Sequence, residues 1–440
     1  MKKYTVILLF IFLAVGLCAQ EFDRVKMDSL FTLIDAGQKG MGSISIFSMG
    51  EEVYQRSIGY SDVENGLLAD ASTKYRIGSI SKPFTSVIIM QLVDEGKLAL
   101  DSKLYSFYPG VPNAREITIE QLLRHESGIF NFTNSREYTT YMEQPKTRTE
   151  LVKIIVDGGT VFKPGERMDY SNSNYVLLSM IIEQVEMKDF SKVLNERIIM
   201  PLKLKNTYYG SKIVSSKNEA FSYNGGDTWE LSTETDMSIP LGAGAIVSTP
   251  TELNIFFFAL FNGKLVSQES LDKMTEFSDN VGLGLFLLPF YEKRAVGHQG
   301  GIDAFQSTAG FFREDDVSIA YTTNGVVMPK NNIMIGALSI FFGLDYSLPK
   351  LAASVKVDVE DLDIYLGVYG APDFPLKVSI SKNESGLIGQ ATGQSAFPLE
   401  AYEKDKFRFE QAALTMQFLP GESKLILRQG GQEFELTLED

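Results

Sequence analysis

Cysteine and histidine are nearly absent from this 440-residue chain, which holds one cysteine, Cys18, and two histidines, His125 and His298. A single cysteine excludes a disulfide scaffold and a thiolate zinc site. Two histidines are too few for a His-rich metal cluster. We therefore expect neither a metal nor a cofactor.

Positive charge is also scarce. The chain has 41 Lys and Arg against 56 Asp and Glu, which gives a net charge of −15. Binding to a phosphate backbone depends on an excess of Lys and Arg, so this balance argues against a nucleic-acid partner. Apolar residues make up 44% of the chain and charged residues 22%, a composition that supplies packed cores and argues against disorder.

Long apolar runs are missing after the N-terminus. Residues 6–17 are apolar, follow Met1-Lys2-Lys3 and precede small residues, which is the pattern of a secretory signal peptide. The run is shorter than the roughly 20 residues that span a bilayer. We predict a signal peptide over residues 1–19 and a secreted or periplasmic protein without an integral membrane span. Acylation at Cys18, as in a lipoprotein, is the alternative, although Leu17 is larger than the residue preferred before such a cysteine.

Hydrophobic periodicity predicts strands at both ends of a helical middle. Alternating residues over 40–60, with a turn at Gly50, predict a hairpin, and residues 302–324 predict further strands. Residues 79 to about 285 have mostly helical period. Two strand-forming segments that lie far apart in the chain must therefore pair across a helical insertion.

Three further helical signals mark the middle and the end of this part. Capping boxes are predicted at residues 118–121 and 249–252, and the second precedes an apolar stretch, 254–261, that we interpret as a buried helix. Residues 333–344 predict another apolar helix.

From Tyr365 the pattern changes to short alternating strands separated by turn residues, which predicts a small β-barrel or β-sandwich. We place a first domain over residues 20–347, a linker over 348–363 and an all-β domain over 364–440.

The strongest chemical signal is Ser79-Ile80-Ser81-Lys82, followed by an apolar helical run. Pro83 is tolerated only near a helix start, so Ser79 is predicted at a helix N-terminus with Lys82 on the same face. Ser-x-x-Lys also occurs at Ser270, Ser347 and Ser379. Ser379 lies in an alternating strand, where residues three apart face opposite sides, and Ser270 is predicted to be a helix N-cap. Context therefore selects Ser79.

Two later elements complete a possible catalytic set. Tyr170-x-Asn172 precedes a helix predicted to begin near Tyr175, and His298-x-Gly300 precedes a predicted strand. A serine nucleophile needs a base, an orienting group and an oxyanion hole, and these elements could supply them.

In this order the motifs resemble the serine β-lactamase and penicillin-binding-protein superfamily, closest to its class C branch, which also holds esterases and D-amino-acid peptidases. The resemblance covers roughly residues 25–345 and implies an α+β fold: an antiparallel sheet flanked by helices, with an all-helical insertion. The barrel-like segment resembles a small all-β domain that often follows such hydrolases.

The resemblance also implies roles for the matching residues. Ser79 would be the nucleophile, Lys82 would help to deprotonate it, and Tyr170 would act as general base and then acid. Asn172 would orient Lys82. The backbone N–H groups of Ser79 and Gly301 would form the oxyanion hole, with His298, Gln299 and Gly300 lining the strand edge.

Two positions depart from the β-lactamase pattern. His298 replaces a lysine, which leaves Lys82 as the one permanent cation of these motifs, and Gln299 replaces a hydroxyl residue that usually meets a substrate carboxylate. We therefore expect poor β-lactam hydrolysis and a small-molecule substrate that is a neutral ester or a D-amino-acid amide or peptide. Changing His298 to Lys should favour a carboxylate-bearing substrate.

Some choices stay open at the level of sequence. We interpret His125 as structural, whereas Trp229 fits either a lid near the site or a surface loop. A slow binding or sensor protein of the same fold, and a cell-wall-associated binding protein, are the alternatives to a hydrolase. The sequence gives no oligomeric state.

Overall fold

The computed structural model describes residues 22–225, 228–349 and 357–439, except 373, 384–385, 395, 410–411, 413 and 430–431. The predicted signal peptide lies outside the described residues, as do residues 350–356 of the predicted linker. None of the described helices combines the length and the apolar character needed to cross a membrane.

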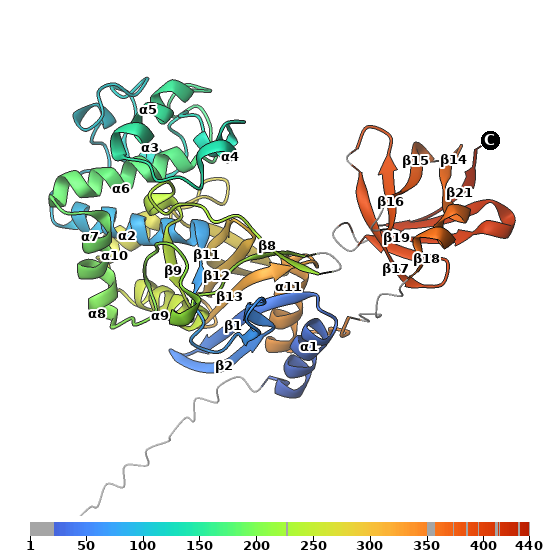
Figure 1. Cartoon of the computed structure of the whole chain (residues 1–440). Coiled ribbons are helices and arrows are strands. Elements are labelled where there is room, and N and C mark those ends of the chain that lie inside the picture. Colours follow the sequence, from blue (N-terminus) through green and yellow to red (C-terminus); the bar gives the residue numbers. More distant parts are fainter. Residues whose placement is uncertain are drawn as a thin grey trace, which may run out of the picture.

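A six-stranded antiparallel sheet forms the centre of the larger part of the chain, in the order β10-β11-β12-β13-β1-β2 (Figure 1). Ile46 of β1 pairs with Ile319 of β13, so the two predicted strand segments meet across the helical middle as expected. The strands are β1 (Gly40–Ser48), β2 (Glu51–Ile58), β10 (Phe286–Phe290), β11 (Lys293–Ile302), β12 (Phe305–Phe312) and β13 (Val317–Val326).

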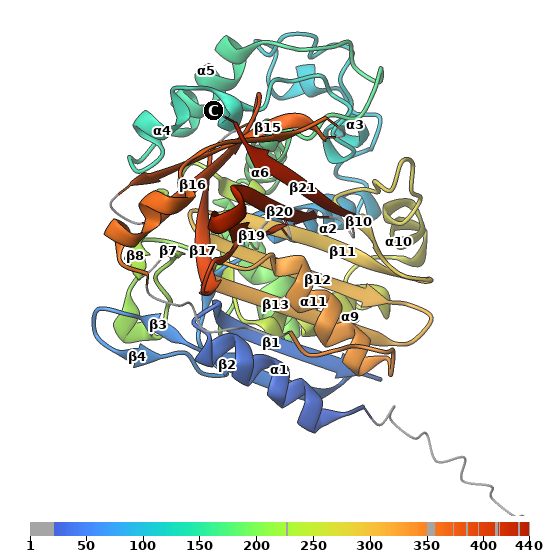
Figure 2. The same cartoon turned by 90° about the vertical axis from the view of Figure 1, so that its right-hand side faces the viewer.

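Serine and isoleucine alternate along β1, and both faces of this strand are buried. Ile44 and Ile46 belong to the core formed with α1 (Arg24–Ala36) and α11 (Lys330–Phe341), which lie together on one side of the sheet (Figure 2). On the other side, the Asn254 side-chain amide of α9 (Pro250–Phe261) donates to the carbonyl and the hydroxyl of Ser45, at 2.9 and 3.0 Å. The hairpin prediction is confirmed.

The segment between β2 and β10 packs on the α9 side and builds the largest hydrophobic core. Phe84 of α2 (Ser81–Asp94) stacks on Phe256 of α9 with ring centroids 3.7 Å apart. The other helices of this segment are α3 (Ile119–Leu123), α4 (Tyr138–Tyr141), α5 (Arg148–Gly158), α6 (Asn172–Glu186), α7 (Phe190–Leu194), α8 (Met200–Leu202) and α10 (Gln268–Met274).

Short strands also occur between β2 and β10. They are β3 (Tyr60–Asp62), β4 (Leu67–Leu68), β5 (Tyr75–Arg76), β6 (Tyr208–Tyr209), β7 (Tyr223–Gly225), β8 (Trp229–Leu231) and β9 (Ile246–Ser248). Four of them, β6 to β9, lie within residues 79–285, which the sequence pattern predicted to be mostly helical. The single-turn helical elements are η1 (Gly78–Ile80), η2 (Leu104–Ser106), η3 (Phe132–Asn134), η4 (Asn195–Ile199), η5 (Ser215–Lys217) and η6 (Leu241–Ala243).

One of the two predicted capping boxes is confirmed. At Thr118 and Gln121 both reciprocal hydrogen bonds are present. At α9, the Thr249 hydroxyl accepts from the Glu252 N–H. The Glu252 carboxylate does not accept from the Thr249 N–H in return, because it accepts from the Thr207 hydroxyl and from the backbone N–H of Lys205. The prediction of the second capping box is therefore wrong, because the carboxylate that would have completed it is bonded to residues outside the helix.

Two other helices also have boundaries that differ from the prediction. Ser267, and not Ser270, is the N-cap of α10, and the hydroxyl of Ser270 donates to Asp94 at 2.6 Å. The apolar helix expected over residues 333–344 is α11, which begins and ends three residues earlier.

The C-terminal part is a closed eight-stranded antiparallel barrel, which confirms the barrel-like fold expected there (Figure 1). Lys39, at the entry to β1, donates to Glu400 of the barrel at 2.7 Å. The barrel elements are β14 (Gly367–Ala371), β15 (Phe374–Asn383), β16 (Gly386–Ala391), β17 (Phe397–Glu403), β18 (Lys406–Phe409), β19 (Leu414–Leu419), β20 (Lys424–Gln429) and β21 (Gln432–Leu438), with the helical turns η7 (Val359–Tyr365) and η9 (Pro420–Glu422).

Candidate active site

Ser79 lies in η1, directly before α2, as the sequence predicted. Two glycines let strand β11 approach this turn. Gly78 has φ +52°, and a Cβ there would lie 2.8 Å from the backbone nitrogen of Gly301. A Cβ on Gly300 would lie 2.0 Å from the carbonyl oxygen of Ile77. Glycine is therefore required on both sides of the contact that places Ser79 beside β11.

Lys82 is fully buried one helical turn after Ser79. Its ammonium donates to the Ser79 hydroxyl at 3.0 Å, to the Asn172 side-chain oxygen at 2.8 Å and to the Ala243 carbonyl at 2.8 Å. All three acceptors are neutral, and burial holds the pKa of Lys82 well below its usual value. Lys82 is therefore suited to exchange a proton with Ser79, and it is not the permanent cation that the sequence analysis assumed.

Tyr170 lies over the same pair, with the Lys82 ammonium 4.9 Å from the centre of its ring. Burial raises the pKa of the Tyr170 phenol, and a hydrogen bond with the Ser79 hydroxyl partly opposes that shift. The free site thus favours a protonated phenol, because a buried phenolate would lack a compensating charge.

The buried ring of His125 supports Tyr170, with ring centroids 4.3 Å apart and planes at 29°. Nδ1 of His125 accepts from the backbone N–H of Ser171 at 3.1 Å, so its remaining proton is on Nε2. Burial and the nearby Lys82 hold the pKa of His125 well below its usual value. His125 therefore holds the turn that carries Tyr170 and Asn172 in place, which is a structural role.

Asn172 is the first residue of α6, so this helix begins three residues before the predicted position at Tyr175. Its side-chain nitrogen donates to the Thr133 hydroxyl at 3.1 Å, which turns its oxygen towards Lys82. The orientation of Lys82 expected from the sequence is present, and Thr133 is a contributor that sequence reasoning missed.

His298 lies inside β11 and not before a strand, which corrects the prediction. Gly297 and Gly300 on either side of it mark close backbone approaches, because a Cβ on each would lie 2.0 Å from a backbone oxygen. Nδ1 of His298 donates to the Gln299 carbonyl. Burial, Lys82 and Lys330 together lower the pKa of His298 to about 3, so the ring is neutral near pH 7.

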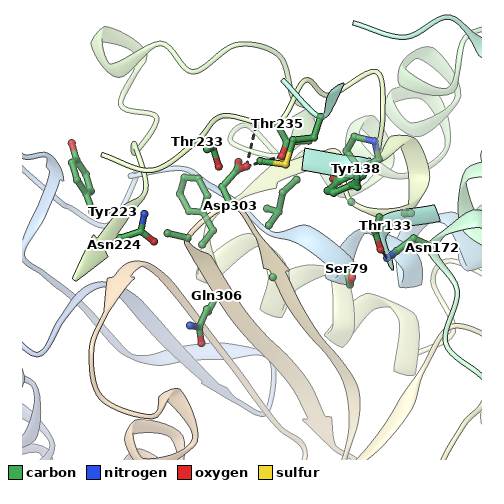
Figure 3. Close-up of a pocket in the computed structure, with 18 of the residues that line it drawn as sticks. Ser79, Thr133, Tyr138, Asn172, Tyr223, Asn224, Thr233, Thr235, Asp303 and Gln306 are labelled. Atoms are coloured by element: carbon green, nitrogen blue, oxygen red, sulfur yellow. Dashed lines mark hydrogen bonds between the residues drawn. The ribbon is translucent and has the colours of Figure 1, made fainter. Parts of the chain in front are cut away.

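Two cavities meet at Ser79. The first encloses about 650 Å³ and includes Asn172, Tyr138 and Tyr223 in its walls (Figure 3). The second encloses about 420 Å³ and is lined by Ser79, Tyr170, Phe286, Leu287, Leu288, His298, Gln299, Gly300, Gly301 and Lys330. Ser79 and Gly301 line both. A bond that is cleaved at Ser79 would therefore have one side in each cavity.

A buried ion pair fixes the far wall of the first cavity. Arg76 donates to Asp303 at 3.0 Å, and the two side chains are 2% and 1% exposed. The other carboxylate oxygen of Asp303 accepts from the hydroxyl and the N–H of Thr235, as Figure 3 shows for this part of the wall. Arg76 also donates to Glu234 at 2.8 Å, so one guanidinium compensates two carboxylates. Trp229 lies in β8, which pairs with β7, and its partner across the strands, Gly225, lines the cavity together with Tyr223 and Asn224.

Lys330 is the second functional candidate that sequence reasoning missed. It is the first residue of α11, and its ammonium donates to the Ser307 carbonyl at 2.8 Å while the side chain lines the second cavity. The only local signal in the sequence is the preceding proline, which predicts a helix start but gives no indication of a functional role.

A serine–lysine–tyrosine site between an antiparallel sheet and a helical insertion defines a class of serine hydrolases. The chain belongs to the beta-lactamase family, whose family model matches residues 30–337. The resemblance stated from the motifs and the α+β fold expected with it are both confirmed.

Individual relatives are distant. The chain is 24% identical over 445 residues to penicillin-binding protein 4* of Bacillus subtilis strain 168, a match that covers 94% of this chain and 98% of that protein. It is 26% identical over 251 residues to a teichoic acid D-alanine hydrolase of Staphylococcus aureus strain MRSA252, covering 57% of each. The crystal structure of D-amino acid amidase from Ochrobactrum anthropi SV3 with D-phenylalanine is similar at a TM-score of 0.66 and 27% identity, and covers 72% of this chain and 99% of that one.

Proposed function

We propose that this protein hydrolyses D-amino-acyl amides and esters through an acyl-enzyme on Ser79. The observation that carries the proposal is the position of Ser79, which is bonded to Lys82 at the junction of two cavities. Relatives named for D-amino acid amide and D-alanine hydrolysis support the choice of acyl group.

The lowered pKa of Lys82 and the raised pKa of Tyr170 favour one path for the protons. Lys82, in its neutral form, accepts the proton of Ser79 as the Ser79 oxygen attacks the acyl carbonyl. Tyr170 gives its phenolic proton to the nitrogen or oxygen of the leaving group and recovers one from Lys82, which lies against its ring. Water then attacks the ester on Ser79, and the protons move in the reverse order. Tyr170 passes its proton to Lys82 and takes one from the water, and Lys82 returns a proton to the Ser79 oxygen as the ester bond breaks. General acid–base assistance of this kind accelerates reactions by about 10²- to 10⁴-fold.

The backbone N–H groups of Ser79 and Gly301 serve as the oxyanion hole in this proposal. Both residues belong to the two cavities, and the glycine contact between η1 and β11 brings their backbones together. One donor of this type contributes roughly 10²- to 10³-fold in rate.

The lining of the two cavities supports one orientation of the substrate. Tyr170, the proton donor to the leaving group, lines the second cavity, whereas Asn172 lines the first. In this proposal the acyl group enters the larger cavity, where the aromatic side chains of Tyr138 and Tyr223 suit a D-amino-acyl side chain, and the leaving group enters the smaller one.

The test compares the protein with two serine variants on D-alanine p-nitroanilide, its L enantiomer, a short acyl ester and a chromogenic cephalosporin. Ser79→Ala should lose turnover by at least about 10³-fold. Ser379→Ala is the matched control, because Ser379-Ile380-Ser381-Lys382 repeats the same tetrapeptide in barrel strand β15 and should leave the rates unchanged.

We expect the D-anilide to exceed the L-anilide, with the cephalosporin last. Mass spectrometry of a rapidly quenched reaction should place the acyl group on the peptide that contains Ser79. Equal rates in wild type and Ser79→Ala on every donor would contradict the proposed function and favour the binding or sensor alternative.

We also propose that residues 1–19 direct export and are then removed, with the unacylated form preferred. N-terminal sequencing of the protein from the extracellular or periplasmic fraction tests this, and an N-terminus at a lipid-modified Cys18 would contradict it.

A further inference from the structure

Asn131, the residue before η3, makes a closed ring of hydrogen bonds with Thr133 and Asn172. The backbone N–H of Asn172 donates to the Asn131 side-chain oxygen at 3.0 Å, and the Thr133 hydroxyl donates to the same oxygen at 3.0 Å. The Asn172 side-chain nitrogen donates to the Thr133 hydroxyl at 3.1 Å, which brings the ring back to the residue where it began. Thr133 and Asn172 line the first cavity (Figure 3), whereas Asn131 is not one of its lining residues.

One backbone group sets the direction of every bond in this ring. The N–H of Asn172 can only donate, so the Asn131 atom that faces it is the carbonyl oxygen. That oxygen can only accept, so the Thr133 hydroxyl gives its proton to Asn131 and keeps its lone pairs for Asn172. The Asn172 side-chain nitrogen therefore faces Thr133, and its oxygen faces Lys82 at 2.8 Å. The ring thus excludes the opposite orientation of Asn172, in which an N–H would point at Lys82.

The orientation of Asn172 decides where the electron pair of a neutral Lys82 points. The Lys82 nitrogen contacts two carbonyl oxygens, those of Asn172 and Ala243, each at 2.8 Å. Carbonyl oxygens can only accept, so they take the two N–H bonds of the neutral amine. The third contact is the Ser79 hydroxyl at 3.0 Å, which has a proton to give. The electron pair of Lys82 is therefore directed at the Ser79 proton.

We propose that Asn131 is a positioning residue for the general base, Lys82. It acts through Thr133, which fixes the amide of Asn172. Without the Asn131 oxygen, the Thr133 hydroxyl is free to turn and donate to Asn172. The amide of Asn172 can then reverse and donate to the neutral Lys82, which takes the electron pair away from Ser79. The expected effect on turnover rests on the proposed function, whereas the ring belongs to the resting protein.

Two substitutions break the ring at different points. Asn131→Leu removes the acceptor at similar side-chain volume, and Thr133→Val removes the hydroxyl but leaves the Asn131 bond to the Asn172 backbone. Each should lower kcat by about 10- to 100-fold with KM within about threefold, because a misdirected base costs rate more than binding. Thr133→Ser restores the hydroxyl and should recover most of the loss. Asn134→Ala is the matched control, because the exposed Asn134 accepts from the opposite atom of the same amide, the Asn131 nitrogen, at 3.2 Å.

Among the described residues, the titratable side chains that face Lys82 are neutral near pH 7. The Lys82 nitrogen lies 4.9 Å from the ring centre of Tyr170 and 5.5 Å from that of Tyr175, and burial raises the pKa of both phenols. Burial and the charge of Lys82 lower the pKa of His125, and they lower that of His298 to about 3. We therefore assign the acidic limb of the kcat/KM profile to Lys82.

The position of that limb is a readout that a merely structural role would not move. The Asn172 oxygen favours the charged form of Lys82, although burial keeps the pKa of Lys82 well below its usual value. In Asn131→Leu and Thr133→Val the neutral form gains a hydrogen bond from Asn172, so the limb should move to lower pH by about one unit. A loss of rate with the limb unmoved in both variants would contradict the positioning role.

A measurement on the resting protein keeps this inference separate from the proposed reaction. NMR of protein labelled with ¹³C at lysine Cε, with Lys82→Arg to identify the signal, follows the titration of Lys82 directly. Its midpoint should lie about one unit lower in Asn131→Leu and Thr133→Val than in wild type and Asn134→Ala. If wild type turns over no donor but this difference persists, the proposed reaction fails and the positioning role stands. Equal midpoints overturn the positioning role whatever the rates, and Thr133→Val decides if Asn131→Leu does not fold.

Discussion

The His125 ring makes two contacts that help to orient Tyr170, and two substitutions can remove them one at a time. The ring stacks on Tyr170, and its Nδ1 accepts from the backbone of Ser171. His125→Phe keeps an aromatic ring and removes the acceptor. His125→Asn keeps an acceptor near the Nδ1 position and removes the ring. Asn also tolerates the backbone at this residue, which has φ +61°.

The structure gives the expected magnitudes. In His125→Phe the buried N–H of Ser171 loses its acceptor, which costs about 1–3 kcal/mol in the free energy of unfolding. In His125→Asn the stack is lost, at about 0.5–1.5 kcal/mol, together with the packing of the ring. Because the Ser171 N–H lies between Tyr170 and Asn172, the Phe variant should lose more in kcat, on the order of 10-fold, with KM nearly unchanged.

Urea unfolding and steady-state kinetics on D-alanine p-nitroanilide measure the two effects. Combining each variant with Tyr170→Phe completes a cycle: if His125 acts through Tyr170, the loss in kcat caused by His125→Phe should largely disappear in that background. A Phe variant that keeps both the stability and the kcat of wild type would refute the reasoning, since the Ser171 N–H would then not need its acceptor.

Three further perturbations follow from the site. Gly300→Ala should abolish activity and lower the unfolding midpoint, because its Cβ would lie 2.0 Å from a backbone oxygen; an active, stable variant would contradict the close approach of η1 and β11. Arg76→Met should cost about 3–5 kcal/mol in unfolding free energy by leaving Asp303 buried and unpaired, whereas Lys377→Met in an exposed pair should cost less than about 1 kcal/mol; equal losses would refute the difference. His298→Asn should leave the shape of the kcat/KM profile unchanged between pH 5 and 8, because a pKa of about 3 places the titration of His298 below that range; loss of a limb there would show that His298 titrates during turnover.

The Ser79–Lys82 pair could be predicted because it depends on one helical turn. A proline, a serine and a lysine within five residues fix both the helix start and the shared face. The β1–β2 hairpin and the barrel strands were predictable for a similar reason, since alternation is a local pattern.

The partners of that pair could not be predicted, because the tertiary fold supplies them. The Ala243 carbonyl reaches Lys82 from η6, and Thr133 reaches Asn172 from η3. Neither has a local signal, since a backbone carbonyl is present at every residue. The same cause explains the error at Glu252, whose carboxylate has a tertiary partner that no capping pattern reveals.

The pairing of β1 with β13 has a consequence for the order in which the active site forms. The segments that bring Ser79, Lys82, Tyr170 and Asn172 precede β11 in the chain, and β1 has no inner neighbour until β13 joins the sheet. Contacts this distant in sequence form late. A folding chain that has formed the helix carrying Ser79 and Lys82 therefore still lacks the Gly301 wall until β11, β12 and β13 complete the sheet.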